Sequence, residues 1–306
     1  MFNFLVNLNS ASGRCKHVWR DIESALKLQQ IDYRCFCTEY ENHASEITES
    51  IEKEYAGEPI NLVVIGGDGT FNEVINAIKD FDHFRMGLIP AGSGNDLARG
   101  MGISNDHMEN LNTILCGETV HKCDVGEIVF SDSTSRKFAI SCGMGLDAEV
   151  CYFALKSRIK DFLNRFHIGE STYLVLTVLR LFSMRTVNAI VRYGNKEEKY
   201  GKLIFMAAMN QQCEGGGVKM APNAKYDDGK LDFISAHNIS KFRGLISLGI
   251  LSKGKGKWIK GISVVPSKET EIILAKKMIF HTDGEFAGKH DRAVIKCVEK
   301  QLTFLN

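Results

Sequence analysis

Apolar and polar residues alternate along the chain, up to about residue 120, in a way that is typical of strands followed by helices. Short apolar runs are separated by longer amphipathic stretches, and this alternation predicts βαβ units with a parallel sheet and helices on its faces. We expect strands at 2–8, 33–39, 61–66 and 86–90, and helices at 14–30, 43–56 and 70–79. The first part of the chain is therefore predicted to be a Rossmann-like α/β domain.

After about Asp124 the pattern changes to one strand-like segment after another, and only 145–183 resembles helix in bulk. Successive strands separated by glycine-containing turns favour an antiparallel β-sandwich. The expected strands are 125–130, 136–142, 186–193, 201–209, 230–236, 271–275 and 293–298. We predict two domains, 1–124 and 125–306, with a C-terminal tail (about 292–306) that can pack back on the first.

Composition and charge narrow the class of protein. The net charge of +1 gives no global field for binding nucleic acid, so no nucleic-acid partner is expected. Nine scattered cysteines without a CxxC pair are typical of reduced thiols in the cytosol. The longest apolar run, 173–182, contains Arg180 and is too short to span a bilayer. We therefore expect a cytoplasmic protein whose membrane contact, if it has one, is peripheral.

The strongest local signal is a glycine-rich turn between a predicted buried strand and a helix. Gly66, Gly67 and Gly69 allow backbone N–H groups to approach an anion, and the N-terminus of the following helix adds partial positive charge. Thr70 and Glu73 have the spacing of a capping box at the start of that helix. This pattern predicts a site that binds phosphate.

Asp68 lies inside this turn, where a carboxylate is unfavourable unless a cation shares the site. The implied cation is magnesium on the phosphates of a nucleotide. The alternative is an ordinary tight turn in which Asp68 caps a helix.

A second glycine-rich loop follows the next predicted strand. Pro90, Gly92 and Gly94 shape a turn, and Asn95 and Asp96 can cap the helix behind it. Two such loops at the carboxyl ends of neighbouring strands would flank one crevice, where open α/β sheets bind ligands. There is no Walker-type GxxxxGK[ST] motif, and the GxGxxA match at 143–148 lacks the acid that a dinucleotide site requires at the end of a second strand.

Two acidic pairs occur in the second half. Asp227 and Asp228 precede Gly229, and a hard cation could be held there with the carbonyls of Lys225 and Lys230, although an ordinary Asp-Gly hairpin turn fits the spacing equally well.

Asp283 and Glu285 flank Gly284 directly after an apolar strand. Two carboxylates at i and i+2 of an extended segment share a face, so one could orient the other while that one accepts a proton from a hydroxyl. Here too, a simple hairpin turn is the alternative.

Taken together, these segments resemble the diacylglycerol kinase catalytic domain superfamily, in particular bacterial soluble lipid kinases related to sphingosine and ceramide kinases. The match covers essentially the whole chain, in order. It consists of NLNSASG at 7–13, GGDGT at 66–70, PAGSGNDLARG at 90–100, GMGLDAEV at 143–150, EGGGVKMAPNAKYDDGKLD at 214–232 and TDGE at 282–285.

The resemblance implies a first domain like that of NAD kinase and phosphofructokinase, a C-terminal antiparallel β-sandwich, and ATP in the cleft between them. It places these residues around the nucleotide: Asn7, Thr38, Gly66, Gly67, Asp68, Gly69, Thr70, Ser93 and Asn95. It also implies a magnesium-linked network of Asp68, Asp96 and Asp124. A second magnesium would bind Asp228 and the carbonyls of Lys225 and Lys230, and Asp283 and Glu285 would form the proton-accepting pair, with a slight preference for Glu285.

The function expected is that of an ATP-dependent, magnesium-requiring lipid kinase that phosphorylates diacylglycerol to phosphatidic acid. The alternatives are a kinase of a soluble acceptor, like NAD kinase, and a nucleotide-binding regulatory module without turnover. The lipid partner would be met at the inner membrane surface, where Lys253, Lys255, Lys257 and Lys260 around Trp258 could dock on anionic headgroups, unless they form only a solvated loop. A homodimer is left open.

Overall fold

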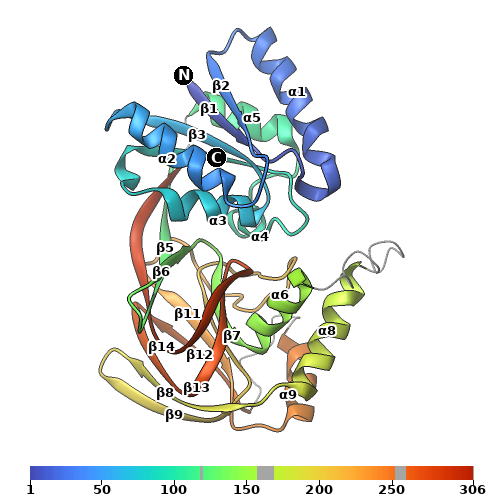
Figure 1. The fold of residues 1–306 in the computed structure, drawn as a ribbon, viewed down its shortest axis with the longest axis vertical. Coiled ribbons are helices and arrows are strands. Elements are labelled where there is room, and N and C mark those ends of the chain that lie inside the picture. The colour runs from blue at the N-terminus through green and yellow to red at the C-terminus, as the bar shows by residue number, and fades with distance from the viewer. Residues whose placement is uncertain (118–119, 157–168, 252–259, 306) are drawn as a thin grey trace.

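A computed structural model describes residues 1–117, 120–156, 169–251 and 260–305. Figure 1 shows two parts, an α/β part formed by the first third of the chain and a larger part rich in β-strands. Within the described residues no helix has the length and apolar character needed to cross a membrane.

The first part contains a parallel sheet with the strand order β4-β3-β1-β2. Its strands are β1 (Phe2–Val6), β2 (Tyr33–Cys37), β3 (Ile60–Gly66) and β4 (Phe84–Pro90). Its helices are α1 (Arg14–Leu28), α2 (His43–Tyr55), α3 (Asp68–Ala77), α4 (Asp96–Met101) and α5 (His107–Cys116), with short 3-10 turns at Ser10–Gly13 and Phe81–His83. The predicted α/β domain is confirmed.

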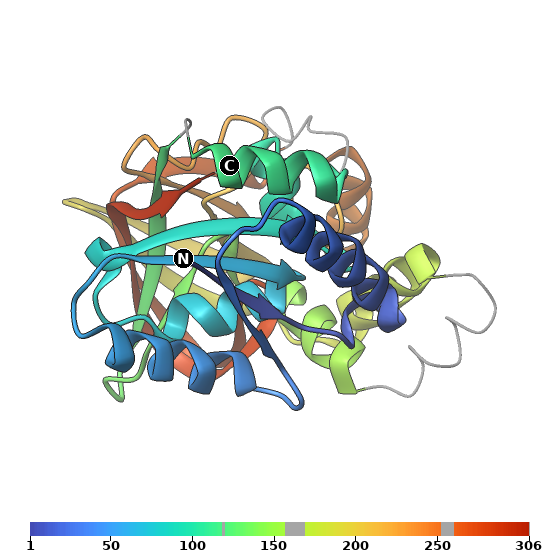
Figure 2. The same cartoon turned by 90° about the horizontal axis from the view of Figure 1, so that it is seen from above.

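Strand β3 shows why this sheet carries helices on both faces (Figure 2). Leu62 and Val64 are buried in the apolar cluster that includes side chains of α2 and α3. Val63 and Ile65 are buried in the opposite cluster with side chains of α1 and α5. Because successive side chains of a strand point to opposite faces, a continuous apolar run requires cover on both sides.

The second part is built from antiparallel pairs, as the sandwich prediction requires. Its strands are β5 (His121–Phe130), β6 (Ser135–Phe138), β7 (Ser141–Gly145), β8 (Val187–Tyr193), β9 (Lys196–Leu203), β10 (Phe205–Met209), β11 (Leu231–Ala236), β12 (Ile262–Ser267), β13 (Glu269–Thr282) and β14 (Glu285–Phe304). Three helices, α6 (Leu146–Lys156), α8 (Gly169–Ser183) and α9 (Lys241–Leu251), lie on one side of these strands (Figure 1).

Helix α9 corrects the expectation that only 145–183 is helical in the second half. Its sequence, KFRGLISLGIL, contains two glycines and leaves several apolar side chains exposed, so it lacks the periodicity of an ordinary amphipathic helix. Helix α5 was not predicted either. The single strand expected at 201–209 is divided at Ile204 into the end of β9 and β10.

Strands β5 and β14 join the two parts. Most of β5 pairs antiparallel with the second half of β14, with a register shift between Val298 and Leu302. At its end β14 turns to pair in parallel with β4, through Phe304 beside Met86, and the Leu305 N–H donates to the Met86 carbonyl at 2.9 Å. The last residues of the chain thus lie against the first sheet, and the strands form one hydrogen-bonded sheet.

Candidate active site

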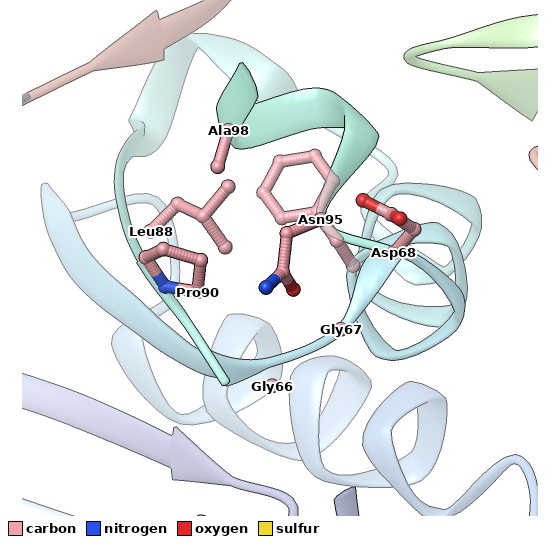
Figure 3. Close-up of a pocket in the computed structure, with 8 residues that line it drawn as sticks. Gly66, Gly67, Asp68, Leu88, Pro90, Asn95 and Ala98 are labelled. Atoms are coloured by element: carbon pink, nitrogen blue, oxygen red, sulfur yellow. The ribbon is translucent and has the colours of Figure 1, made fainter. Parts of the chain in front are cut away.

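The two glycine-rich loops lie against each other at the carboxyl ends of β3 and β4. The Ala91 N–H donates to the Gly66 carbonyl at 2.8 Å, and a Cβ added to Gly92 would lie only 2.4 Å from the Cα of Gly67. Only glycine permits this approach. Gly66, Gly67 and Asp68 therefore line the same small pocket as residues of the second loop (Figure 3).

Asn95 holds the second loop closed. Its backbone has the left-handed φ of 52°, its Oδ1 accepts from the Gly92 N–H at 2.9 Å, and its Nδ2 donates to the Gly92 carbonyl at 3.1 Å. In Figure 3 the amide of Asn95 points into the space between Pro90 and Gly67. Ser93 is exposed at the tip of this loop. The loop thus presents an exposed hydroxyl and an ordered amide beside the first loop.

Asp68 links the two loops. Its Oδ2 accepts from the Asp96 N–H at 3.0 Å and its Oδ1 from the Leu97 N–H at 3.2 Å, so Asp68 caps helix α4. This corrects the expectation that Asn95 and Asp96 provide that cap, because Asn95, the residue before the helix, makes no side-chain cap bond. The alternative interpretation, that Asp68 caps a helix, is therefore partly right. The helix it caps is α4, whereas Asp68 itself lies at the start of α3.

The predicted capping box at Thr70 and Glu73 is wrong. Helix α3 begins at Asp68 after Gly67, and no side chain caps it. Glu73 instead accepts from the Ala44 N–H of α2 at 3.1 Å. The N-terminal N–H groups of α3 are therefore left to other partners, as expected of an anion-binding helix end.

Negative charge accumulates at Asp68. Burial, followed by the charges of Asp96 and Asp283, raises the pKa of Asp68 to about 6, and its two backbone hydrogen bonds oppose this rise. Asp96 is buried as well; it pairs with Arg99 and accepts from the Gly216 N–H at 2.7 Å. Two neighbouring carboxylates with one guanidinium fit a hard divalent cation, which favours carboxylate oxygen, so Asp68 and Asp96 suit magnesium.

Asn7 and Thr70 form a further contact at the same sheet edge. The Asn7 Nδ2 donates to the Thr70 Oγ1 at 2.9 Å, and a Cβ on Gly66 would lie 3.0 Å from the Thr70 side chain. Thr38 is buried just beyond β2, where its N–H donates to the Val6 carbonyl. These residues follow three neighbouring parallel strands, so the fold gathers them at one edge.

Asp283 is held by four donors. Its Oδ1 accepts from the N–H groups of Ile140 (2.8 Å) and Ser141 (3.0 Å), and its Oδ2 from the Ala139 N–H (2.9 Å) and the Asn72 Nδ2 (2.8 Å). Burial raises the pKa of Asp283, and these hydrogen bonds act against the rise. A carboxylate whose lone pairs are used in this way organises the site more readily than it accepts another proton.

Glu285 meets the first glycine-rich loop. A Cβ added to Gly69 would lie 2.8 Å from the Glu285 Oε1, so the carboxylate rests against the loop where Gly69 has no side chain. Burial raises the pKa of Glu285, and Arg136 lowers it in part. No hydrogen bond from a described residue reaches this carboxylate, in contrast to that of Asp283. Of the two acids, Glu285 is the one available to accept a proton.

The turn between Asp283 and Glu285 is held by His281 and its partners, which were not predicted from the sequence. The Nδ1 of His281 accepts from the Gly284 N–H at 3.1 Å, and its Nε2 lies 2.7 Å from Asp147 and 3.2 Å from Glu214. Burial, with the charge of Asp147, raises the pKa of Glu214 to about 8.

Asn72 was missed as well. The available signals were the position of His281 directly before TDGE and of Asn72 one helical turn after Asp68. Neither position in the sequence shows which distant residue the side chain of His281 or Asn72 contacts.

Asp124 belongs to a second group. Its carboxylate accepts from the Gly229 N–H and the Lys300 N–H, each at 2.7 Å, so Asp124 connects the turn at Gly229 with β14. The hydrogen bond between Asp68 and Asp96, in contrast, connects the two glycine-rich loops. Asp228 is exposed, and its Oδ1 accepts from the Lys230 N–H at 3.1 Å. The second magnesium at Asp228, with the carbonyls of Lys225 and Lys230, stays a prediction.

The basic segment proposed for headgroup contact, with Lys253, Lys255, Lys257 and Trp258, lies outside the described residues.

Comparison with known proteins agrees with this architecture. The family described as the diacylglycerol kinase catalytic domain matches residues 2–128, and the YegS C-terminal NAD kinase beta sandwich-like domain matches residues 141–306. The fold and site thus define a kinase of the NAD kinase-like architecture. The chain belongs to the family defined by this C-terminal domain, and its first part matches the diacylglycerol kinase catalytic domain, so the resemblance stated above is confirmed.

Individual relatives are similar over most of the chain. The chain is 26% identical to a diacylglycerol kinase of Staphylococcus haemolyticus over 86% of its length and 76% of the relative, and 25% identical to one of Bacillus subtilis over 92% and 88%. A solved structure described as a diacylglycerol kinase from Bacillus anthracis shares the fold, with a TM-score of 0.71, 18% identity and coverage of 99% and 96%. An NAD kinase from Archaeoglobus fulgidus in complex with ATP has a TM-score of 0.56, 14% identity and coverage of 100% and 94%.

Proposed function

We propose that this protein transfers the γ-phosphoryl group of ATP to a lipid hydroxyl, with diacylglycerol as the acceptor and phosphatidic acid as the product. The observation that carries the proposal is the contact of Glu285 with Gly69. It brings a carboxylate suited to accept a proton against the loop suited to hold phosphate, although 216 positions separate the two residues (285 − 69).

The nucleotide lies along the carboxyl edge of the first sheet. Its phosphates meet the backbone at Gly66–Thr70 and the start of α3, where N–H groups and the helix dipole favour anions. Asn95 lines the same pocket from the second loop, and Ser93 is exposed at the tip of that loop. Magnesium, held by Asp68 and Asp96, would neutralise phosphate charge as the phosphoryl group moves.

Glu285 accepts the proton of the attacking hydroxyl. The hydroxyl oxygen bonds to the γ-phosphorus, its proton passes to a Glu285 oxygen, and the bond from that phosphorus to the oxygen of the β-phosphate breaks to leave ADP. Asp283 does not take part in the transfer itself. Its four hydrogen bonds fix the turn that carries Glu285. Positioning and charge stabilisation therefore contribute most of the acceleration.

Incubation with radiolabelled ATP and magnesium tests the proposal, with diacylglycerol in mixed micelles and NAD offered side by side. We expect labelled phosphatidic acid and no labelled NADP. Label in NADP alone would establish the soluble-acceptor alternative. That alternative is tested because the C-terminal domain is of the NAD kinase-like kind. Tight binding of magnesium-ATP without product from any lipid extract would establish the regulatory alternative.

A screen of lipid hydroxyls, with mass-spectrometric identification of the products, then defines the acceptor. A strong preference for a sphingoid base or a polyprenol would replace diacylglycerol in the proposal and leave the chemistry unchanged. Pocket shape decides among such lipids.

A further inference from the structure

Two neighbouring helices carry an unusual share of the exposed apolar side chains. Among the described residues eleven large hydrophobic side chains are exposed, and five of them lie on α8 and α9. Phe242 is 66% exposed and Leu179 is 60% exposed. We call this surface the α8–α9 face, and its apolar members are Leu179, Phe182, Phe242, Ile246 and Ile250. A concentrated apolar surface of this kind marks an interaction site.

The helices are fixed side by side (Figure 1). The Lys241 Nζ, at the start of α9, donates to the carbonyls of Phe182 (2.8 Å) and Met184 (2.5 Å) at the end of α8. Gly244 also brings α9 close to the sheet, because a Cβ there would lie 2.9 Å from Ile204. The exposed apolar side chains thus lie on two helices that hydrogen bonds and close packing hold in place.

The charge on this face selects its partner. Arg243 and Lys260 flank Ile246 and Ile250 around a hollow of about 390 Å³. The sequence from 237 to 260 contains no Asp or Glu. The exposed apolar side chains of α9, with Arg243 and Lys260 beside them, match the surface of an anionic bilayer, where the apolar groups enter the acyl region and the cations meet headgroup phosphates.

The face also connects with the candidate site. Phe286, directly after Glu285, is 40% exposed, and its ring centroid lies 4.9 Å from that of Tyr152 on α6. The Tyr152 ring is 5.3 Å from Phe153, over which the Arg180 guanidinium of α8 lies at 4.0 Å. Side chains in contact therefore lead from the carboxylate to α8.

We propose that the α8–α9 face docks on a bilayer containing anionic phospholipid and so brings the candidate site to its lipid acceptor. This inference rests on the proposed lipid kinase function. It adds the residues that meet the membrane, which are separate from the basic segment considered in the sequence analysis except for Lys260.

Flotation with vesicles tests the docking directly. The full chain is mixed with vesicles of phosphatidylcholine alone or with added phosphatidylglycerol. We expect the unmodified chain to float with the mixed vesicles, and the Phe182→Ser/Phe242→Ser variant to lose at least about tenfold in partitioning. Arg243→Gln/Lys260→Gln should lose about fivefold per charge, and only on anionic vesicles. Leu28→Ser, which changes an 86% exposed leucine on α1, is the matched control and should float normally.

Activity separates docking from chemistry. The apolar double variant should phosphorylate a short-chain diacylglycerol in free solution as well as the unmodified chain does, but be slower on diacylglycerol in vesicles. Flotation of that variant at the unmodified level overturns the docking proposal, as does a dimer in sedimentation that the same variant dissociates. If no lipid is phosphorylated in either form while flotation follows the expected pattern, the lipid kinase function fails and the docking face stands.

Discussion

Asn72 donates a hydrogen bond to Asp283 at 2.8 Å, and these two residues come from opposite halves of the chain. Asn72 lies on α3, one turn after Asp68, and Asp283 lies in the turn that carries Glu285. The hydrogen bond therefore sets the position of the turn relative to the phosphate-binding loop. Contacts of this kind explain how a site assembled from two domains keeps its geometry.

Replacement of Asn72 by alanine should reduce turnover about tenfold or more, because a small shift of Glu285 misaligns the transfer. Stability should fall by about 1–3 kcal/mol, the cost of an unmade buried hydrogen bond. Asn110→Ala is the control, since Asn110 is also a buried asparagine but donates to the Ser104 carbonyl and not to Asp283. Turnover and urea unfolding measure both effects. An equal loss of turnover in the control would show that the Asp283 contact has no special importance.

The two acids of the turn should respond differently to substitution. Glu285→Gln removes the proton acceptor and should lower turnover about 100-fold or more, with the stability almost unchanged. Asp283→Asn places an amide NH2 among groups that all donate, so it should cost about 1–3 kcal/mol of stability in addition to activity. Turnover and denaturant unfolding of both variants test this. A stable, active Glu285→Gln variant would remove Glu285 from the mechanism.

Much of this site could be predicted from the sequence, because its loops depend on local chemistry. A glycine is required wherever two backbones approach as closely as at Gly67 and Gly92, and such glycines stand out in a sequence after an apolar strand. The α/β order of the first part follows from apolar runs that need cover on both faces.

The remaining features depend on the tertiary fold. The partners of Asn72, His281 and Glu214 lie far away in the chain, so no spacing rule identifies them. The cap of α4 was mispredicted for the same reason, since the carboxylate that caps it is that of Asp68, in the first glycine-rich loop and 28 positions before Asp96. Helix α9 escaped prediction because its exposed apolar residues do not follow a one-sided pattern.

A side chain at Gly69 should impair activity without weakening the fold. In Gly69→Ala the new Cβ would come within 2.8 Å of the Glu285 Oε1, so that carboxylate must move. Gly69 lies inside α3, where alanine is the better helix former by up to about 1 kcal/mol. We expect turnover to fall at least about tenfold and the midpoint of thermal unfolding to stay or rise. In the Glu285→Gln background the same change should have little further effect on turnover. A full additive loss there would place the damage elsewhere.

The buried group around His281 should make stability depend on pH. The pKa of Glu214 is raised from 4.5 to about 8, so the folded state holds a proton that the unfolded state releases. Stability contributed by that proton is present at low pH and is lost as the pH rises from about 5 to 8, by at most about 1.4 kcal/mol per pH unit. Glu214→Gln, which cannot ionise, should flatten this slope. Urea unfolding across this pH range measures it, and an unchanged slope in the variant would contradict the assignment.

Asp68 should couple magnesium binding to both activity and stability. Its pKa is raised by burial beside Asp96 and Asp283, so a cation that neutralises this charge should stabilise the folded protein. Magnesium with ATP should therefore raise the thermal midpoint of the unmodified chain. Asp68→Ala should abolish that rise and lower turnover at least about 100-fold, the scale of a lost electrostatic group. Asp82→Ala, which changes an exposed acid away from the loops, is the control and should keep both properties. A magnesium-dependent rise that persists in Asp68→Ala would mean that other residues hold the cation, and near-normal turnover would remove Asp68 from the mechanism.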